Sequence, residues 1–82
     1  MVFVYILGKV KTGNEMGVLN ELKNARQVKK ASLTYGVYDV CVEARLKTME
    51  ELDDFLFNVI RKVPGISDTA TLVVSKTTSK EN

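Results

Sequence analysis

Residues 35–46 read YGVYDVCVEARL and set the centre of the fold. From Tyr38 to Leu46 apolar and polar side chains alternate, which predicts a strand with one buried face. Gly36, just before it, can adopt the positive φ that a tight turn requires. Residues 28–34 form another strand-like stretch on the other side of this turn. The sequence therefore predicts a β-hairpin in the middle of the chain.

A predicted helix lies on each side of this hairpin, and both begin with the same signal. Thr12-x-x-Glu15 and Thr48-x-x-Glu51 have the spacing of a capping box, which predicts a helix start at each threonine. Apolar residues at helical spacing follow both signals. The first helix should end near Arg26, and Pro64-Gly65 should end the second.

The two ends of the chain predict the remaining strands. Residues 2–11 are β-branched and aromatic, and residues 66–75 are rich in threonine and valine. The element order is then β-α-β-β-α-β, which is the ferredoxin-like α+β pattern of a four-stranded antiparallel sheet with two helices on one face. We expect a single domain over residues 1–76 and a frayed polar tail over residues 77–82.

The first strand is apolar on both faces. Phe3 and Tyr5 point to one side, and Val4 and Ile6 point to the other. A sheet with one face in water alternates apolar and polar residues, so we expect the face without helices to be covered by a second subunit. The small size agrees, because a chain of 82 residues with one cysteine and no histidine has neither a disulfide nor a zinc site to stabilise it. The expected assembly is a dimer that pairs through the sheet, of the dimeric α/β-barrel type.

Charge and composition exclude several classes of partner. A net charge of +2 is too small to favour nucleic acid. The apolar start is short and has no basic segment before it, so neither a signal peptide nor a membrane span is expected, and the cytoplasm is the expected location. No cofactor motif or metal-ligand pattern is present in the sequence.

Two motifs resemble a known family. The hairpin stretch 33–40, LTYGVYDV, contains G-x-Y-D, and residues 63–71, VPGISDTAT, follow the second helix. In register with the element order, they resemble the RAM domain, the effector-binding half of the Lrp/AsnC transcriptional regulators. The similarity runs over about residues 2–76.

The resemblance implies a function and an assembly. It implies dimers that join into an octamer or a decamer, with an amino-acid effector bound where dimers meet; glutamine and branched-chain amino acids are candidates. Family members usually carry a helix-turn-helix before this domain, whereas here the first strand follows Met1 directly. We therefore expect a stand-alone RAM domain with no direct DNA binding, which modulates genes of amino-acid metabolism through a partner such as a full-length Lrp/AsnC regulator.

The candidate ligand-binding residues lie in two segments. An aspartate at a strand start can pair with an ammonium group, and loop N–H groups can bind a carboxylate, while two threonines spaced by two present their hydroxyls on one strand face. The structural alternative is a hairpin glycine, a packed tyrosine, an aspartate that bonds its own turn, and threonines chosen for β-propensity. The candidates are Gly36, Val37, Tyr38 and Asp39 in the hairpin, and Thr69, Ala70 and Thr71 in the last strand.

Three other functions compete with this one. A small α+β-barrel enzyme, such as a monooxygenase or isomerase, would normally need a histidine, a cofactor or an acid–base pair, so no enzyme is expected. An RNA-binding domain of the same fold would need aromatic residues on both central strands to stack bases. The third predicted strand carries Val40, Cys41, Val42 and Glu43 instead, so RNA binding is not expected. An ACT-like regulatory domain also binds amino acids, but the G-x-Y-D and P-G-I motifs favour RAM. Cys41 is expected to be a small packing residue, and Tyr35 a residue of the core or of an interface; the sequence leaves a further role for either open.

Overall fold

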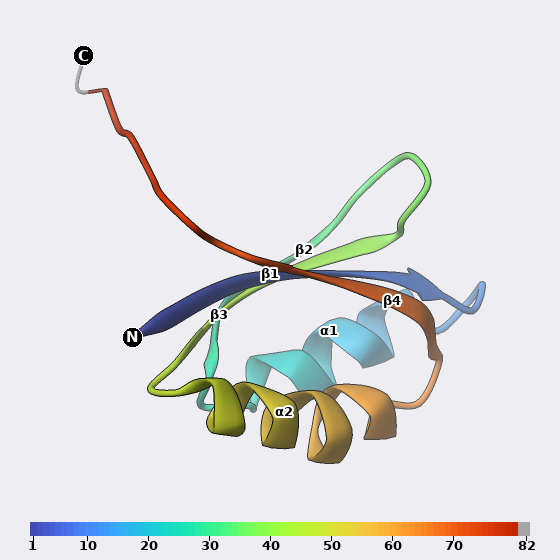
Figure 1. Cartoon of the computed structure of the whole chain (residues 1–82). Coiled ribbons are helices and arrows are strands. Elements are labelled where there is room, and N and C mark those ends of the chain that lie inside the picture. Colours follow the sequence, from blue (N-terminus) through green and yellow to red (C-terminus); the bar gives the residue numbers. More distant parts are fainter. Residues whose placement is uncertain (81–82) are drawn as a thin grey trace.

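The computed structural model describes residues 1–80, and its elements follow the predicted order. The strands join into one antiparallel sheet in the order β2-β3-β1-β4. Both helices lie against one face of this sheet, below it in Figure 1. The predicted fold class is confirmed. In chain order the elements are β1 (Val2–Val10), α1 (Glu15–Lys23), β2 (Val28–Leu33), β3 (Val40–Leu46), α2 (Met49–Asn58), the short 3-10 helix η1 (Ile60–Lys62) and β4 (Ile66–Val73).

The core lies between the sheet and the helices. Alternate residues of β1 and β3 point into it, and they meet Leu22 of α1 and Phe55 of α2. Burial of one large apolar side chain contributes about 1.5–3 kcal/mol, so this layer supplies most of the stability. The buried apolar residues are Val4, Ile6, Val10, Val18, Leu22, Val40, Val42, Ala44, Leu46, Leu52, Phe55, Ile60 and Val63.

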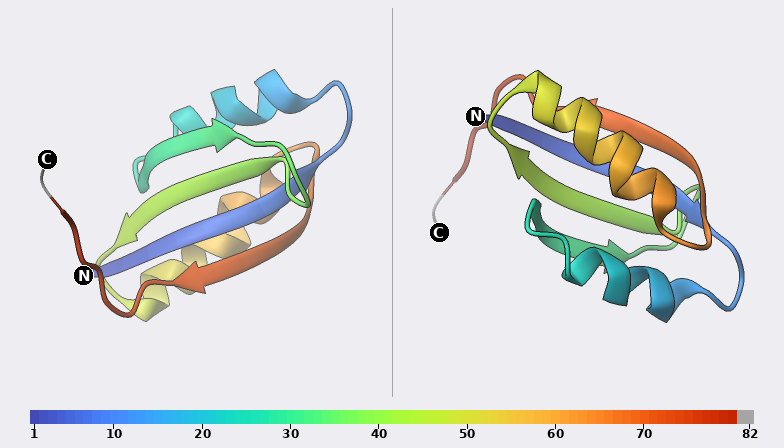
Figure 2. Two further views of the ribbon diagram at one scale, coloured as in Figure 1. Left: turned by 90° about the horizontal axis from the view of Figure 1, so that it is seen from above. Right: turned by 90° about the horizontal axis from the view of Figure 1, so that it is seen from below.

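The opposite face of the sheet has no helix over it. Figure 2 shows it from above, with the strands in front of the helices. Phe3, Tyr5 and Leu72 remain 45%, 41% and 54% exposed there. An apolar face of this kind is unusual in contact with water, and we call it the open face. The two-sided apolar pattern predicted for the first strand is thus present in the structure.

The first helix begins later than the sequence predicted. Its N-cap position is Asn14 and not Thr12, and no side chain caps it; Glu15 instead accepts a hydrogen bond from the N–H of Gly13 (2.9 Å). Gly13 has φ +95°, so the chain turns there before the helix starts. The predicted capping box at Thr12 is therefore wrong. The helix also ends at Lys23, short of Arg26, in a turn closed by Asn24 N–H to Glu21 O (3.2 Å).

The second predicted helix start, at Thr48, is confirmed, although the Glu51 carboxylate bonds the N–H of the residue before the N-cap and not that of Thr48. Thr48 Oγ1 accepts from the N–H of Glu51 (3.1 Å), and the Glu51 carboxylate accepts from the N–H of Lys47 (2.6 Å). The α-helix ends at Asn58, and a 3-10 turn continues the chain to Lys62 before Pro64-Gly65.

The strand ends differ slightly from the prediction. β3 begins at Val40, because Tyr38 and Asp39 belong to the hairpin loop, and β4 ends at Val73. Residues 74–80 have no regular secondary structure, and residues 81–82 of the expected frayed tail lie outside the described part of the chain. Within residues 1–80 no helix is long and apolar enough to span a membrane.

Candidate functional site

The hairpin loop between β2 and β3 is closed at its base by Thr34. Its N–H donates to Asp39 O (2.8 Å), and its hydroxyl donates to Tyr38 O (2.7 Å). Gly36 has φ +127°, and the side chains of Tyr35 and Val37 beside it are fully or largely exposed. The prediction that Tyr35 packs in the core is therefore wrong for the single chain, because the loop carries it beyond the end of the sheet. The base of the loop is therefore rigid, while its tip presents backbone groups and apolar side chains to the exterior.

Asp39 is anchored to β1. Its Oδ2 accepts from the N–H of Val10 (2.8 Å), and its own N–H donates to Gly8 O (2.9 Å). The half-buried carboxylate lines two grooves, one of about 560 Å³ with Lys9 and Lys11 and one of about 340 Å³ with Thr34 and Tyr35. A carboxylate has acceptor capacity for several donors, so Asp39 can keep its bond to Val10 and still accept from a ligand.

Thr69 and Thr71 lie on the helix side of the sheet. Thr71 is opposite Ile6, which is buried in the core, so its side chain points to the same side. Both threonines line a groove of about 620 Å³ between β4 and α2. Ala70 faces the other way, opposite Leu7 on the open face.

Gly8 lies between the two predicted segments. Its carbonyl accepts from Asp39, and a Cβ placed on it would lie 3.5 Å from Thr69 Cγ2 and 3.4 Å from Val40 Cγ1. The hairpin loop and Thr69 therefore meet at the same end of the sheet, on either side of β1. Within a single chain, however, Asp39 and Thr69 line different grooves.

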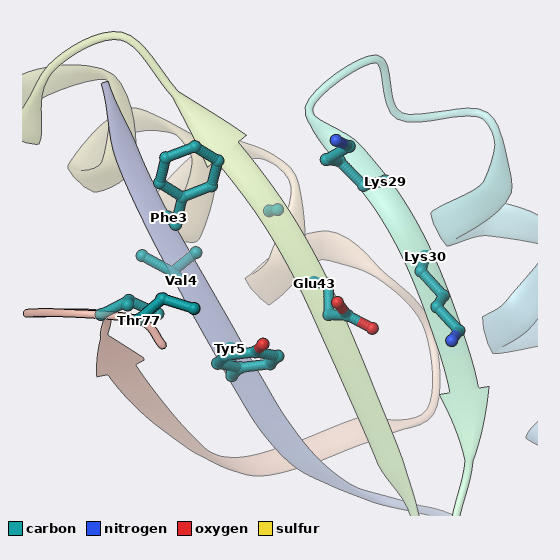
Figure 3. Close-up of a pocket in the computed structure, with 9 residues that line it drawn as sticks. Phe3, Val4, Tyr5, Lys29, Lys30, Glu43 and Thr77 are labelled. Carbon is teal, nitrogen blue, oxygen red and sulfur yellow. The ribbon is translucent and has the colours of Figure 1, made fainter. Parts of the chain in front are cut away.

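The sequence analysis assigned no binding role to the residues of two further grooves. Asp53, Phe57 and Arg61 line the groove that holds the two threonines. On the open face, Lys29, Lys30 and Glu43 border a hollow of about 540 Å³ together with Phe3 and Tyr5 (Figure 3). Strand alternation puts Glu43 on the same face as Phe3, but only the register of β2 brings the lysines beside them.

The described residues offer neither a cluster of metal ligands nor an activated cysteine. Within residues 1–80, no three side chains of the His, Cys, Asp and Glu types cluster to hold a metal ion. Cys41 is half-buried on the open face, opposite Leu7 on β1 and Ser32 on β2. These neighbours supply no base, so the thiol lacks the surroundings that activate a cysteine.

Comparison with known proteins adds the family. The Lrp/AsnC ligand binding domain matches residues 4–82. The chain belongs to this Lrp/AsnC domain family. The resemblance inferred from the hairpin and P-G-I motifs is confirmed.

Relatives in this family agree in sequence and in fold. The HTH-type transcriptional regulator FL11 of Pyrococcus abyssi is 40% identical over 73 residues, which are 89% of this chain and 48% of that protein. The chain thus spans about half the length of the curated relatives it matches. The crystal structure of FFRP-DM1 superposes with a TM-score of 0.87 at 36% identity, covering 92% of this chain and all of that one. Escherichia coli AsnC shares the fold, with a TM-score of 0.90 at 23% identity over 99% of this chain and 55% of AsnC.

Proposed function

We propose that this Lrp/AsnC domain is a regulatory module that binds an amino-acid effector at a site built by more than one chain. One observation carries the proposal. Asp39 and the threonines of β4 lie at the same end of the sheet, on either side of Gly8, yet they open into separate grooves. Two half-sites of this kind can hold one ligand when a neighbouring subunit faces them.

The chemistry of the residues suits a zwitterion. The fixed Asp39 carboxylate can accept from an ammonium group, and the exposed N–H groups around Gly36 and Val37 can bind a carboxylate. The hydroxyls of Thr69 and Thr71 can donate to or accept from a polar side chain of the effector. Tyr38, which is half-buried at the loop base, would hold the loop in place.

A structural neighbour supports an amino acid as the ligand class to test first. The transcriptional regulator NMB0573 of Neisseria meningitidis was solved as a complex with L-Met. That protein is 14% identical to this chain with a TM-score of 0.88, so the likeness is one of fold alone. Glutamine and branched-chain amino acids remain the candidates for this chain.

The open face supports a homodimer. Its exposed aromatic and aliphatic side chains match the composition of interface cores. The guanidinium carbon of Arg45 also lies 5.4 Å from the centre of the Phe3 ring, and arginine is another residue common in interfaces. A stable interface buries about 800 Å² on each partner, which the face of a four-stranded sheet can supply. We propose that two chains pair through this face and that dimers join further into an octamer or a decamer.

The output of the module is regulation of transcription. Its curated relatives are HTH-type transcriptional regulators, so we propose that effector binding alters an assembly that acts on genes of amino-acid metabolism in the cytoplasm. A full-length family regulator is a candidate partner. We propose no enzymatic role, because the chain has no histidine and the carboxylates of α2 lie in its first turns, where they favour the helix dipole.

A thermal-shift screen against the twenty amino acids tests the proposal. The expected result is a rise of the melting temperature with one or a few of them, because a ligand that binds only the folded state stabilises it. Asp39→Asn and Thr71→Val should each weaken binding of the best ligand at least tenfold by calorimetry. Asp54→Asn, an exposed change outside these grooves, should not. Binding that survives both site variants unchanged would reject this site.

A further inference from the structure

Two consecutive lysines of β2 border the same hollow on the open face. Successive residues of a regular strand point to opposite faces, so Lys29 and Lys30 would normally face apart. The register of β2 with β3 explains the difference, because Val28 pairs with Ala44. The next residue of β3, Glu43, pairs with Lys30, so Lys29 is an extra residue in β2. This is a β-bulge, and bulges re-aim side chains next to functional sites.

The opposite wall of the hollow is aromatic. Phe3 and Tyr5 of β1 lie on one side, the two lysines lie on the other, and Glu43 stands between them (Figure 3). Val74, whose N–H donates to Phe3 O, and Thr77 extend the aromatic wall. The volume of about 540 Å³ is within the range of about 300–1,000 Å³ that is typical of small-molecule sites. The hollow can thus hold a molecule with a flat apolar body and a polar end.

The charges of the lining indicate the charge of that polar end. Two ammonium groups and one carboxylate border the hollow, which leaves one positive charge in excess. Glu43 lies between Lys30 on one neighbouring strand and Tyr5 on the other, so it can balance one lysine only. A single carboxylate on a ligand would balance the second lysine, whereas a phosphate dianion would exceed the excess and be repelled by Glu43. Charge complementarity therefore favours a monoanion.

We propose that this hollow binds a small aromatic carboxylate, with its ring against Phe3 and Tyr5 and its carboxylate between the two lysines of the bulge. Contacts between aromatic rings favour such a ligand over an aliphatic acid, and hydrogen bonds between ammonium and carboxylate groups are stronger than neutral ones. The site is separate from the proposed effector site. The groove of Thr71 opens on the helix side of the sheet, and Asp39 lies in the hairpin loop.

The open face is also the proposed dimer interface, and the hollow is compatible with that role. β2 is an edge strand, so the lysine end of the hollow lies at the rim of the face, whereas β1 is a central strand and the aromatic end lies inside it. A second copy would cover the aromatic end, leave the lysine end open to solvent, and so hold the ligand between the paired sheets. The lining comes from a single chain, so the site does not depend on this pairing.

Calorimetric titration with 2-naphthoate tests the site, with 2-naphthamide as the uncharged counterpart. We expect the carboxylate to bind about tenfold more tightly than the amide, because only the carboxylate forms charge-assisted bonds. Lys29→Ala and Lys30→Ala should each weaken its binding about tenfold, and Lys30→Arg should keep most of it. Lys23→Ala removes an equal charge from exposed surface on α1 and should leave binding unchanged. Amide NMR shifts caused by 2-naphthoate should centre on Tyr5 and Glu43.

A further variant separates this inference from the proposed effector site. Asp39→Asn should abolish effector binding and leave the affinity for 2-naphthoate intact. No binding at millimolar concentration, equal affinity for the acid and the amide, or shifts confined to the groove of Thr71 would each overturn the site. The same conclusion would follow if neither lysine substitution changed the affinity, or if Lys23→Ala lowered it as much as Lys30→Ala.

Discussion

Asp39 has a structural task in addition to any binding role. Its carboxylate accepts from the N–H of Val10, which is 29 residues earlier in the chain, and so joins the hairpin loop to the end of β1. If this carboxylate is removed, the partly buried N–H of Val10 loses its hydrogen-bond acceptor, which costs stability. A loss of ligand binding in an alanine variant at this position would therefore mix two effects.

Two substitutions at Asp39 separate these effects. We expect Asp39→Ala to lower the free energy of unfolding by about 1–2 kcal/mol, because the charge-assisted bond to Val10 is lost at a half-exposed site. Asp39→Asn keeps an acceptor oxygen and removes the charge, so it should lose less stability and still bind the effector poorly. Urea denaturation of both variants measures the difference. Equal stability of wild type and Asp39→Ala would mean that the bond to Val10 contributes nothing.

Gly65 is the glycine with the strictest requirement. It has φ +96°, and a Cβ there would lie 2.7 Å from Asn14 Nδ2 and 2.8 Å from Asn14 Cβ. We expect Gly65→Ala to cost about 3 kcal/mol, from backbone strain plus this clash at the start of α1.

Gly13 is a matched control for that change. It has nearly the same φ, +95°, and nothing lies within 4 Å of its Cβ position. Gly13→Ala should cost only the strain, about 1–2 kcal/mol. Thermal unfolding of both variants gives the comparison, and equal losses would show that the contact with Asn14 is relieved by a small shift.

At the level of the elements, two identical sequence signals have different outcomes. Thr48 caps α2 through Glu51, whereas Thr12 makes no cap and α1 starts after Asn14. Thr48→Ala should therefore lower the free energy of unfolding by about 1 kcal/mol. Thr12→Ala should stay within about 0.5 kcal/mol of wild type, as exposed substitutions usually do. A larger loss for Thr12→Ala, measured by chemical denaturation, would contradict the assigned start of α1.

The sequence predicted the elements well where local patterns decide them. Alternation located β3, the threonine-glutamate spacing located α2, and the sequence of β1 indicated a strand that is apolar on both faces. The prediction of a cap at Thr12 failed because Gly13 adopts a positive φ and turns the chain before the helix begins. The spacing of a threonine and a glutamate carries no information about the backbone conformation of the residues between them. The α-helix α2 ends at Asn58, before Pro64, since the 3-10 turn lets Ile60 and Val63 reach the core.

The candidate site could be predicted from the sequence less completely than the helices and strands. The hairpin motif located Asp39, but its bond to Val10 depends on packing between distant segments. The pairing of β4 with β1 decides that Thr71 faces α2 and Ala70 faces outward. Asp53 and Arg61 had the appearance of ordinary helix-surface charges, and only the position of α2 beside β4 brings them to the same groove as the threonines.

At the level of the whole molecule, large apolar side chains are exposed on both sides of the sheet. Phe3, Tyr5 and Leu72 are uncovered on one side of the sheet, and Phe57 is uncovered on the other. Single exposed residues of this kind are common, but a continuous face is typical of an interface. Stability should therefore depend on protein concentration, because association stabilises the folded chain by mass action.

The central claim is that the effector is held between subunits. Native mass spectrometry of the wild type and of Tyr5→Glu, a change on the open face, each with the amino acid that raises the melting temperature most, tests it directly. We predict bound effector on the wild-type assembly and none on chains that Tyr5→Glu leaves as monomers. An effector that binds the monomer as tightly as the assembly would contradict the claim.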